Sequence, residues 1–391
     1  VVAEVPAATL ADDAPVYDRE SRKPDYISEK QSIDPIDVIE KDKKEDDCDT
    51  DFNKLLLDLL SSPNIASKEW VYQQYDHMVR TNTVVSPGSD AAVLRIKGAD
   101  KGLALTTDCN GRYCYLDPKE GGRIAVAEAA RNIVCSGARP LAITDGLNFG
   151  NPMNPEVFWQ FEKCAEGISE ACKVFDTPVT GGNVSFYNES PEGAVFPTPI
   201  IGMVGLLDDV SSAVTQDFKD KGDLVLLLGE TSSELGGSEY LKSIHNVEAG
   251  KIPVIDLEEE KRVQTVCLEA IKMGIVKSAH DCSEGGLAVN LAESCISGSV
   301  GVDIDLNNKN ALKQGFDNIY NLFSESQSRI VISISPDDLD KVKQLTDEHG
   351  ISLTNLGKVS GNKLIINNII ELPIKELKDT WKTSIASQMQ N

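Results

Sequence analysis

The sequence has few histidines, no excess of basic residues and no long apolar run. Its 38 lysines and arginines are outnumbered by 62 acidic residues, which gives a formal net charge of -24. A surface of that sign repels phosphate backbones and anionic headgroups, so neither nucleic acid nor a membrane is an expected partner. No apolar stretch approaches the roughly 18 residues needed to cross a bilayer, and no signal peptide is recognisable. We therefore expect a cytoplasmic protein that holds any phosphorylated ligand through local donors and a divalent cation.

The common nucleotide-binding and catalytic motifs are missing as well. There is no Walker A loop, no Gly-x-Gly-x-x-Gly after an expected strand, and no Ser/His/Asp or Cys/His set in a recognisable context. None of the four histidines has metal-ligand spacing to a cysteine or an acid: His77, His245, His280 and His349. If the protein uses a nucleotide, it binds that nucleotide outside the common phosphate-loop folds.

The cysteine content indicates the redox environment of the protein, and the chain length indicates the number of domains. The nine cysteines, an odd number, show no paired spacing, which is typical of reduced thiols in a cytosolic protein. A length of 391 residues predicts two or three domains, each able to bury its own core. The chain starts Val-Val-Ala without an initiator methionine, so we expect it to come from the middle of a longer polypeptide.

The order of predicted elements indicates an α/β or α+β fold. Residues 1–50 are rich in acids and sustain neither a helical nor a strand period, so an acidic extended linker is predicted there. Strands and helices alternate after it, which predicts a first domain over residues 51–212 and a second over residues 213–391. In the first domain, helices are predicted over 51–60, 68–79, 121–137 and 155–175, and strands over 103–109, 141–145 and 199–207. In the second, strands are predicted over 224–229 and 330–334, and helices over 258–273 and 287–296.

Two acids are predicted to end strands. Asp108 and Asp145 each follow an apolar run, at the place where open sheets bind ligands. A solvated acid at a strand end is equally common, so both interpretations of Asp108 stay open.

The most informative pattern is Thr177-Pro-Val-Thr-Gly-Gly-Asn-Val-Ser185, which predicts a short strand running into a Gly-Gly turn. Gly181 and Gly182 leave no Cβ in the way of a ligand, and the bare N–H groups of such a turn suit phosphate oxygens. Asn183 offers an oxygen of the kind that hard cations bind, and Ser185 offers a hydroxyl. Alone, the pattern also fits a tight turn without a ligand.

Two histidine segments carry weaker signals. His77 stands beside Asp76 in an aromatic segment and is predicted to be a structural, hydrogen-bonding histidine. His280–Gly286 precedes a predicted helix whose free N–H groups suit an anion. The alternative is a capping turn in which Asp281 or Ser283 is the cap.

Seven segments, taken in order, resemble one known family. They are Tyr72–Asn82, Pro87–Val93, Thr106–Asn110, Gly122–Asn132, Leu147–Pro152, Gly181–Ser185 and Phe323–Arg329. From about residue 50 to about residue 380 the chain is similar to the C-terminal half of phosphoribosylformylglycinamidine synthase in its smaller bacterial form. That enzyme resembles two fused aminoimidazole-ribonucleotide-synthetase-like units, and this chain is similar to the second unit and its preceding linker.

The resemblance implies an ATP-dependent ligase of purine biosynthesis. Formylglycinamide ribonucleotide, ATP and ammonia from glutamine would give the amidine, ADP and phosphate, with Mg²⁺ neutralising charge. The implied partners are the N-terminal half of the enzyme, whose unit pairs with the first domain here, a glutaminase subunit and a small accessory subunit. Residue by residue, the resemblance places Asp145 and Gly182 at ATP, Asn183 at Mg²⁺ and Ser185 at the substrate.

The chain departs from the family in one respect. The family's catalytic histidine lies in the first half, and the matching strand here, Thr106–Asn110, contains no histidine. The resemblance therefore implies no catalytic base in this chain. Asp108 takes the place of a metal-binding acid, and Ser324–Gln327 echoes a substrate-binding motif of the first half, and whether either works here stays open.

Three functions follow as hypotheses. The first is a nucleotide-contributing half of the synthase that is inactive alone. The second is a self-sufficient synthetase or kinase of the same superfamily, which a stable homodimer with Mg-ATP turnover would favour. The third is a scaffold half with a structural nucleotide, which would retain nucleotide tightly without turnover even beside the other half.

Overall fold

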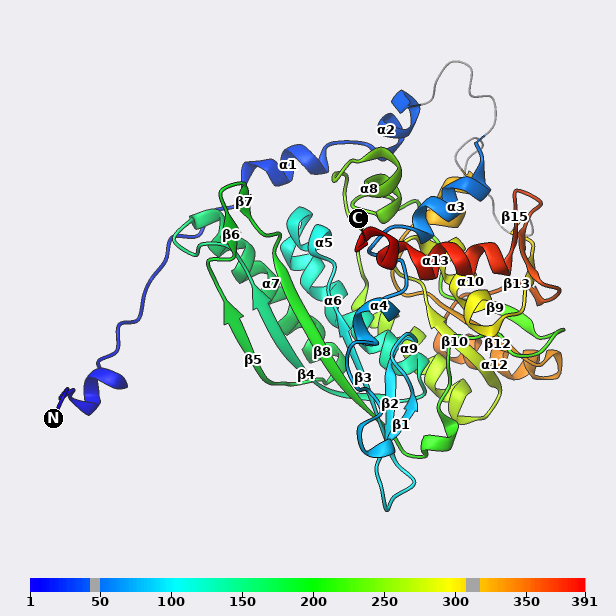
Figure 1. Cartoon of the computed structure of the whole chain (residues 1–391), viewed down its shortest axis with the longest axis horizontal. Helices are drawn as coiled ribbons and strands as arrows, with labels where there is room; N and C mark the ends of the chain where they lie inside the picture. The colour runs from blue at the N-terminus through cyan, green and yellow to red at the C-terminus, as the bar shows by residue number, and fades with distance from the viewer. Residues whose placement is uncertain (43–49, 307–316, 391) are drawn as a thin grey trace.

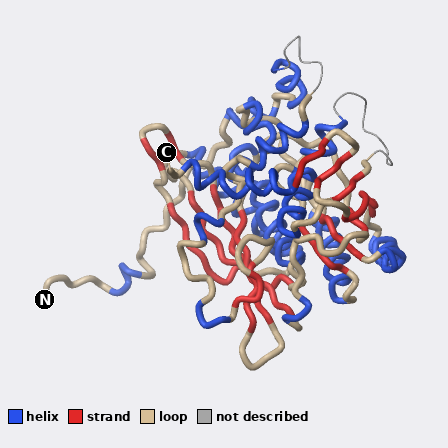
Figure 2. Tube along the Cα trace, turned by 45° about the vertical axis from the view of Figure 1, so that its right-hand side comes forward, coloured by secondary structure: helices blue, strands red, loops and turns tan. Residues whose placement is uncertain are grey.

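Two large β-sheets with helices packed on them form the body of the protein (Figure 1). The computed structural model describes residues 1–42, 50–306 and 317–390. The first sheet belongs to an N-terminal sheet domain and the second to a C-terminal α/β domain, which confirms the predicted fold class. The strands form two separate groups, and the N-terminal arm runs away from both (Figure 2).

The first sheet has six strands in the order β1-β2-β3-β8-β4-β5. They are β1 (Thr83–Val85), β2 (Ala92–Arg95), β3 (Gly102–Asp108), β4 (Arg139–Asn148), β5 (Val179–Ser185) and β8 (Thr198–Leu207). Strand β8 is antiparallel to β3 and to β4, and β4 is parallel to β5. Strands β3, β4 and β5 therefore run in the same direction, and their carboxyl ends lie at one end of the sheet.

Within the described residues, helices cover one face of this sheet and leave the other open. They are α5 (Gly111–Leu116), α6 (Pro118–Cys135) and α7 (Pro155–Phe175). Beneath them Ile143, Ile201 and Met203 are buried in one core, because alternate residues of a strand point to the same face. On the opposite face Leu105 and Ile200 are each 41% exposed. The open face is the side on which β4, β5 and β8 are seen in Figure 1.

Helix α6 begins earlier than predicted. Asp117 caps it and Pro118 is its first residue, so Gly121 and Gly122 lie inside the helix and not before it. A Cβ on Gly121 would come within 2.6 Å of the Cys114 backbone, and one on Gly122 within 2.6 Å of the Cys164 backbone. The two glycines therefore permit close packing of α6 on α5 and α7.

The second sheet has seven strands in the order β10-β12-β9-β13-β11-β14-β15. They are β9 (Leu224–Leu228), β10 (Val276–Asp281), β11 (Val302–Ile304), β12 (Ile330–Ile334), β13 (Leu353–Val359), β14 (Lys363–Ile366) and β15 (Ile370–Pro373). Its helices are α8 (Glu239–His245), α9 (Leu257–Lys272), α10 (Gly286–Gly298), α11 (Asp317–Phe323), α12 (Leu339–His349) and α13 (Ile374–Gln388). Leu226 packs with α9 and α12, and Leu227 with α10, so the apolar strand β9 is covered on both faces, as predicted.

The segment before the first sheet is more ordered than predicted. Two helices, α1 (Asp25–Gln31) and α2 (Pro35–Asp42), lie within the predicted extended linker, and residues 43–49 of its acidic run lie outside the described residues. The ring of Tyr26 stacks on Tyr115 with centroids 4.4 Å apart, so contacts distant in sequence hold α1. Local periodicity does not reveal such contacts.

Helix α3 (Phe52–Leu60) confirms the helix predicted over 51–60, but Asp51 is its cap and not its first residue. The boundary between the two domains stays a prediction. The packing of α3, however, links it to the second domain. Although α3 precedes the first sheet, Leu56 and Leu59 are buried with residues of the second domain. In the same region, the indole N–H of Trp381 donates to the Ile65 carbonyl at 3.0 Å.

The helix predicted over 68–79 is largely absent. Helix α4 (Glu69–Tyr72) occupies only its start. Asp76 accepts the Met78 N–H, so a local side-chain contact replaces the helical bond. The His77 ring packs edge-on against Tyr72, and its Nδ1 has no partner within the described chain, so the predicted hydrogen-bonding role is wrong.

The remaining short elements are the 3₁₀ turns η1 (Ala7–Leu10), η2 (Val79–Thr81), η3 (Val210–Ser212) and η4 (Pro336–Asp338) and the small hairpin of β6 (Glu189–Ser190) and β7 (Gly193–Ala194). The eight cysteines of the described ranges are all free thiols. Over those ranges, no helix combines the length and apolar character that crossing a bilayer requires.

Candidate functional site

The residues predicted to bind ligands lie on β4 and β5, at the edge of the first sheet. Strand β5 pairs only with β4 in the described chain and is exposed along most of its length. The strands align the predicted residues in neighbouring cross-strand pairs, which are Asp145–Gly182, Gly146–Asn183 and Asn148–Ser185.

Asp145 and Asn183 point to opposite faces of the sheet. A Cβ placed on Gly182 would meet Asp145 Oδ1 at 2.0 Å, so the carboxylate lies on the side toward which Gly182 points. A Cβ on Gly146 would meet Asn183 Oδ1 at 3.8 Å, so that amide lies on the other side. Because side chains alternate along a strand, Asp145 faces the helices, whereas Asn183 and Ser185 face the open side.

The predicted Gly-Gly turn is wrong. Gly181 and Gly182 lie inside β5, and neither has a positive φ. The parallel ladder to β4 continues through both residues to Ser185, which keeps them extended. The outward main-chain groups of this edge strand remain open to another chain or a ligand.

Asp145 is not at a strand end, because β4 continues to Asn148. Asp108 does end β3, and both acids oppose Ile201 of the intervening strand β8. Two strand spacings, about 10 Å, therefore separate their backbones. Burial raises the pKa of Asp145 above its ordinary value.

A substitution at Gly182 tests how closely this residue approaches the Asp145 carboxylate. We expect Gly182→Ala to lower the free energy of unfolding by about 1–3 kcal/mol, because the new methyl group overlaps the Asp145 carboxylate. Gly181→Ala is the matched control, since a Cβ there meets nothing within 4 Å. Urea unfolding of both variants measures the difference, and equal losses would contradict this close approach.

A cavity of about 770 Å³ lies between the open face of the first sheet and the second domain. Thr107 and Thr144 of the sheet line one side, and Asp90, His280 and Glu293 line another. None of the four predicted ligand residues borders it. Any site that they form thus opens onto the free edge and not into this chain's own cavity.

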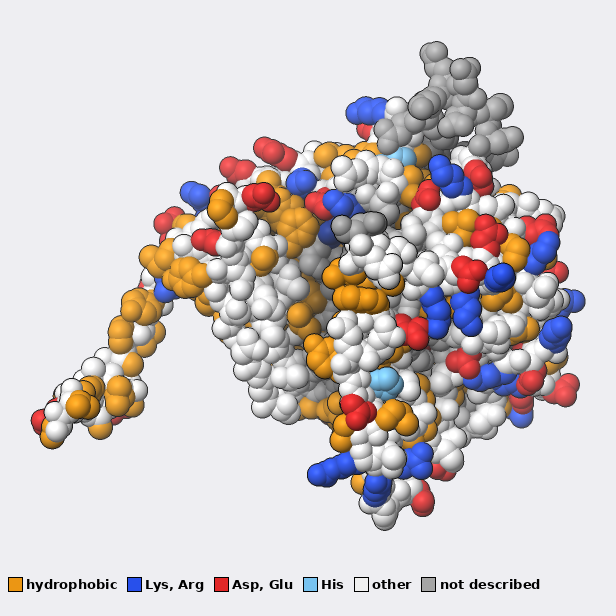
Figure 3. All heavy atoms as spheres, viewed as in Figure 1, with side chains coloured by type: hydrophobic (Ala, Val, Ile, Leu, Met, Phe, Trp, Pro, Cys, Tyr) orange, Lys and Arg blue, Asp and Glu red, His pale blue; other side chains and the backbone are white. Residues whose placement is uncertain are grey.

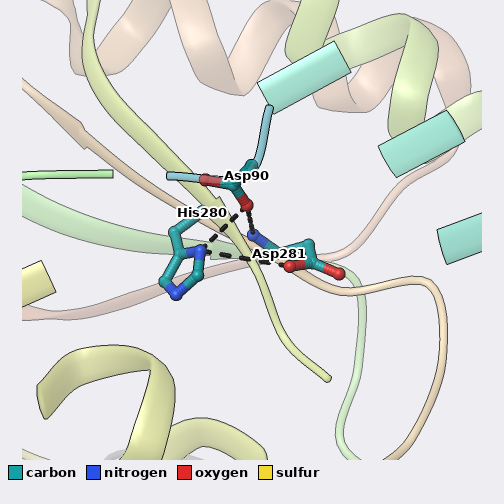
Figure 4. A group of neighbouring side chains, drawn as sticks. All are labelled: Asp90, His280 and Asp281. Atoms are coloured by element: carbon teal, nitrogen blue, oxygen red, sulfur yellow. Dashed lines mark hydrogen bonds and ion pairs between the residues drawn. The ribbon is translucent and has the colours of Figure 1, made fainter. Parts of the chain in front are cut away.

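His280 joins the two domains within this cavity (Figure 4). Its Nδ1 lies 2.9 Å from Asp90 Oδ1, and its Nε2 lies 3.1 Å from Glu293 Oε2. Burial alone would lower the pKa of His280, but these two carboxylates raise it well above its ordinary value. The raised pKa and the carboxylate facing each ring nitrogen favour the protonated ring, in which both nitrogens donate.

No histidine has metal-ligand spacing to an acid in the sequence, but the fold brings His280 beside Asp90 and Glu293. One potential ligand atom each of Asp90, His280 and Asp281 lies within 4.8 Å of the others. Because each ring nitrogen faces a carboxylate, Asp90 on one side and Glu293 on the other, the three side chains form an ion-pair contact between the domains in this structure. The only sequence signal for this cluster is the adjacent pair His280-Asp281, because Asp90 lies 190 positions away and no local pattern marks strand β10.

A second buried network surrounds Arg131 of α6. The guanidinium is fully buried, with Nη1 2.8 Å from Glu260 Oε2 and Nη2 2.9 Å from Gln327 Oε1. Asp281 and Glu128 lie somewhat farther away, at 3.6 and 3.8 Å. Gln327, part of the segment that echoes a substrate motif, is thus engaged inside this chain. Nearby, Asp108 accepts from the Asn132 side chain at 3.1 Å.

Glu325 occupies the position predicted for an anion at the start of α10. Its carboxylate accepts the N–H of Gly285 at 2.8 Å, the N–H of Glu239 at 2.8 Å and the hydroxyl of Tyr113. Gly285 caps α10 without a side-chain cap, so the predicted capping by Asp281 or Ser283 is wrong. Burial and then the charge of Glu284 raise the pKa of Glu325 to about 7.

The raised pKa of Glu325 predicts a pH dependence. The folded protein holds this proton more tightly than the unfolded chain, whose carboxyl titrates near 4.5. The free energy of unfolding should therefore fall as pH rises from about 4.5 to above 7, by up to about 3 kcal/mol. We expect Glu325→Gln to make this slope shallower in urea unfolding at several pH values. Part of the pH slope should remain in this variant, because Asp281 also has a pKa of about 7. A wholly unchanged slope would contradict the raised pKa of Glu325.

Two family descriptions match this chain. Residues 88–207 match the N-terminal domain of AIR synthase related proteins, and residues 220–366 match their C-terminal domain. The first range contains every strand of the first sheet except β1, and the second every strand of the second sheet except β15. Together the two ranges span most of the chain. The chain belongs to the AIR synthase related proteins.

Among curated proteins, the chain is similar to PurL subunits of phosphoribosylformylglycinamidine synthase. It is 52% identical to that of Moorella thermoacetica over 389 residues, which are 98% of the chain and 51% of the relative. It is 51% identical to that of Alkaliphilus metalliredigens, covering all of the chain and 52% of the relative. The chain thus spans about half the length of the relatives that it matches.

Solved structures of PurL share the fold. The structure of T. maritima PurL complexed with FGAR superposes with a TM-score of 0.68 at 19% identity, over 84% of this chain and 54% of that one. T. maritima PurL complexed with ATP gives 0.63 at 19% identity, over 82% of this chain and 52% of that one. The PurLQS structure from Thermotoga maritima gives a TM-score of 0.60 at 20% identity, over 74% of this chain and 46% of that one.

Proposed function

We propose that this chain is the second half of the synthetase subunit of phosphoribosylformylglycinamidine synthase, a cytoplasmic enzyme of purine biosynthesis. The reaction would convert formylglycinamide ribonucleotide, ATP and ammonia to the amidine, ADP and phosphate. Two findings support the proposal: the chain is about 50% identical to PurL subunits over its whole length, and it covers about half the length of those subunits.

The observation that carries the proposal is the position of the four ligand residues. Asp145, Gly182, Asn183 and Ser185 lie at an exposed sheet edge, outside the cavity of their own chain. A site of this kind needs a second surface to enclose a ligand. We propose that the first half of the enzyme supplies that surface together with the catalytic base.

The open face of the first sheet fits such a partner. Figure 3 shows this region with apolar and uncharged atoms, while charged side chains gather elsewhere. Apart from Arg139 at the start of β4, its outward residues on the central strands are uncharged and include Leu105, Thr107, Thr144, Ile200 and Val204. A contiguous uncharged face on a protein with net charge -24 favours burial against another unit. A glutaminase and a small accessory subunit are proposed as further partners, since a PurLQS complex shares the fold.

Asn183 fits a role at Mg²⁺. Its side chain is exposed on the open face, and within the described chain its amide makes no hydrogen bond. One neutral oxygen is a weak site by itself, so nucleotide phosphates and water would have to complete the Mg²⁺ coordination. Gly182 would contact ATP through its main chain, and the Asp145 carboxylate would contact it around the edge of β5. When bound, Mg-ATP supplies the phosphoryl group that activates the formamide oxygen for displacement by ammonia.

The decisive experiment measures phosphate release from Mg-ATP with formylglycinamide ribonucleotide and ammonium. We expect no substrate-dependent release by this chain alone and release after a separately expressed first half is added. Turnover by the chain alone would overturn the proposal and favour a self-sufficient relative. Retained nucleotide without turnover in the mixture would favour a structural nucleotide half.

A further inference from the structure

The turn after β5 is built around one side chain, Asn188. Its Nδ2 lies 2.7 Å from the Ser185 carbonyl oxygen and 3.0 Å from the Phe149 carbonyl oxygen. The Asn188 N–H also donates to the Phe149 carbonyl, at 3.1 Å, and the Tyr187 N–H donates to the Gly150 carbonyl at 3.0 Å. Tyr187 has a φ of 63°, a conformation that a tyrosine adopts only when its surroundings hold it. The turn is therefore fixed to the segment that leaves β4.

These contacts settle which way the Asn188 amide points. A carbonyl oxygen can only accept, so the group that faces both carbonyls is the NH₂. Both protons of this NH₂ group are then donated to the Ser185 and Phe149 carbonyls. The amide oxygen lies toward the Ser185 hydroxyl, with 3.2 Å between Oδ1 and Oγ. Because Oδ1 can only accept, the hydroxyl is the donor of the hydrogen bond between Ser185 Oγ and Asn188 Oδ1. Nδ2 also lies 3.1 Å from Oγ, but both of its protons already have carbonyl acceptors.

The hydroxyl of Ser185 is left with lone pairs and no proton to offer. Ser185 lies on the open face, half-buried, on the same side of β5 as Asn183. In the half of β4 and β5 nearest Ser185, the residues that share this face carry no charge: Thr144, Gly146, Asn148, Gly181 and Asn183. A phosphate group would need donors or a cation here, and these side chains include no cation.

We propose that Asn188 is a positioning residue that makes Ser185 a hydrogen-bond acceptor. The substrate group that Ser185 recognises is then a donor, a ribose hydroxyl or an amide N–H, and not a phosphate oxygen. This inference rests on the proposed function, in which Ser185 contacts the ribonucleotide substrate.

The first arm of the test compares Ser185→Ala, Asn188→Ala and the double variant in the mixture of this chain and the first half. We expect each single variant to raise KM for formylglycinamide ribonucleotide by about 3- to 10-fold, the usual effect of one hydrogen bond. Because the two residues act as a unit, the double variant should raise KM no further. KM for ATP and kcat should change little. An Asn188→Ala variant that leaves KM unchanged would overturn the positioning role.

The second arm identifies the recognised group and does not depend on how well Asn188→Ala folds. It measures Ser185→Ala against wild type with three substrate analogues: the 2′-deoxyribonucleotide, the N-methyl amide and the riboside without its phosphate. The Ser185→Ala effect should disappear with whichever of the first two lacks the recognised donor, and should persist with the riboside. Loss of the effect with the riboside alone would mean a phosphate contact and would overturn the inference. Absence of activity in the wild-type mixture would instead contradict the proposed function.

Discussion

Arg131→Met is expected to lower the free energy of unfolding by about 3–5 kcal/mol at pH 8, because it leaves buried carboxylates without their cation. Glu260 Oε2 lies 2.8 Å from the guanidinium, and both side chains are fully buried. Methionine fills similar space but cannot pair with Glu260 or Asp281. Urea unfolding measures the loss.

Arg123→Met is the matched control for this prediction. Arg123 lies on the same helix, but its pairs with Glu170 and Glu120 are partly solvated, so we expect a loss of at most about 1 kcal/mol. At pH 5 the Arg131→Met loss should shrink, since Asp281, with a pKa of about 7, then takes up a proton. Similar losses for both arginines at pH 8 would contradict the buried-pair argument.

Asn183→Ala is expected to reduce phosphate release by the mixture of this chain and the first half by roughly 100-fold, since removing a metal ligand costs at least as much as disturbing its supporting groups. Stability should stay within about 0.5 kcal/mol, because the side chain is exposed. Steady-state phosphate release at several Mg²⁺ concentrations measures the effect. The variant should also need more Mg²⁺ for half of its maximal rate.

Val184→Ala provides the control for Asn183. Val184 is the next residue of β5, points to the other face and is 48% exposed, so activity should stay near wild type. If Asn183→Ala leaves both the rate and the Mg²⁺ dependence unchanged, the assignment of Asn183 to the metal is wrong. If Val184→Ala loses as much as Asn183→Ala, the strand as a whole and not the amide is responsible.

Elements with strong local signals could be predicted from the sequence. Helix α7 has the predicted bounds, Pro155–Phe175, because an asparagine cap and a proline mark its start and a left-handed residue ends it. Strand β9 was identified by its continuous apolar run, which is typical of a strand covered on both faces. The mixed α/β fold follows from such elements in alternation.

The arrangement of the site could be predicted only in part. Cross-strand pairing places Asp145 beside Gly182, yet it also puts Asp145 and Asn183 on opposite faces. Two glycines in a row predict a turn from local preferences, and only the ladder to β4 keeps them extended. The pairing of His280 with Asp90 depends on two domains meeting, which no local pattern reports.

The packing of α3 with the second domain affects how the chain folds while the ribosome synthesises it. Helix α3 emerges from the ribosome before either sheet, but its apolar side packs with strands and helices made much later. The contact of Ile65 with Trp381 closes a loop of 316 positions. Contacts of such long range form slowly, because the intervening chain must first be ordered. The leucines of α3 therefore stay exposed during most of synthesis, and chaperone binding to the nascent chain should concentrate on this segment.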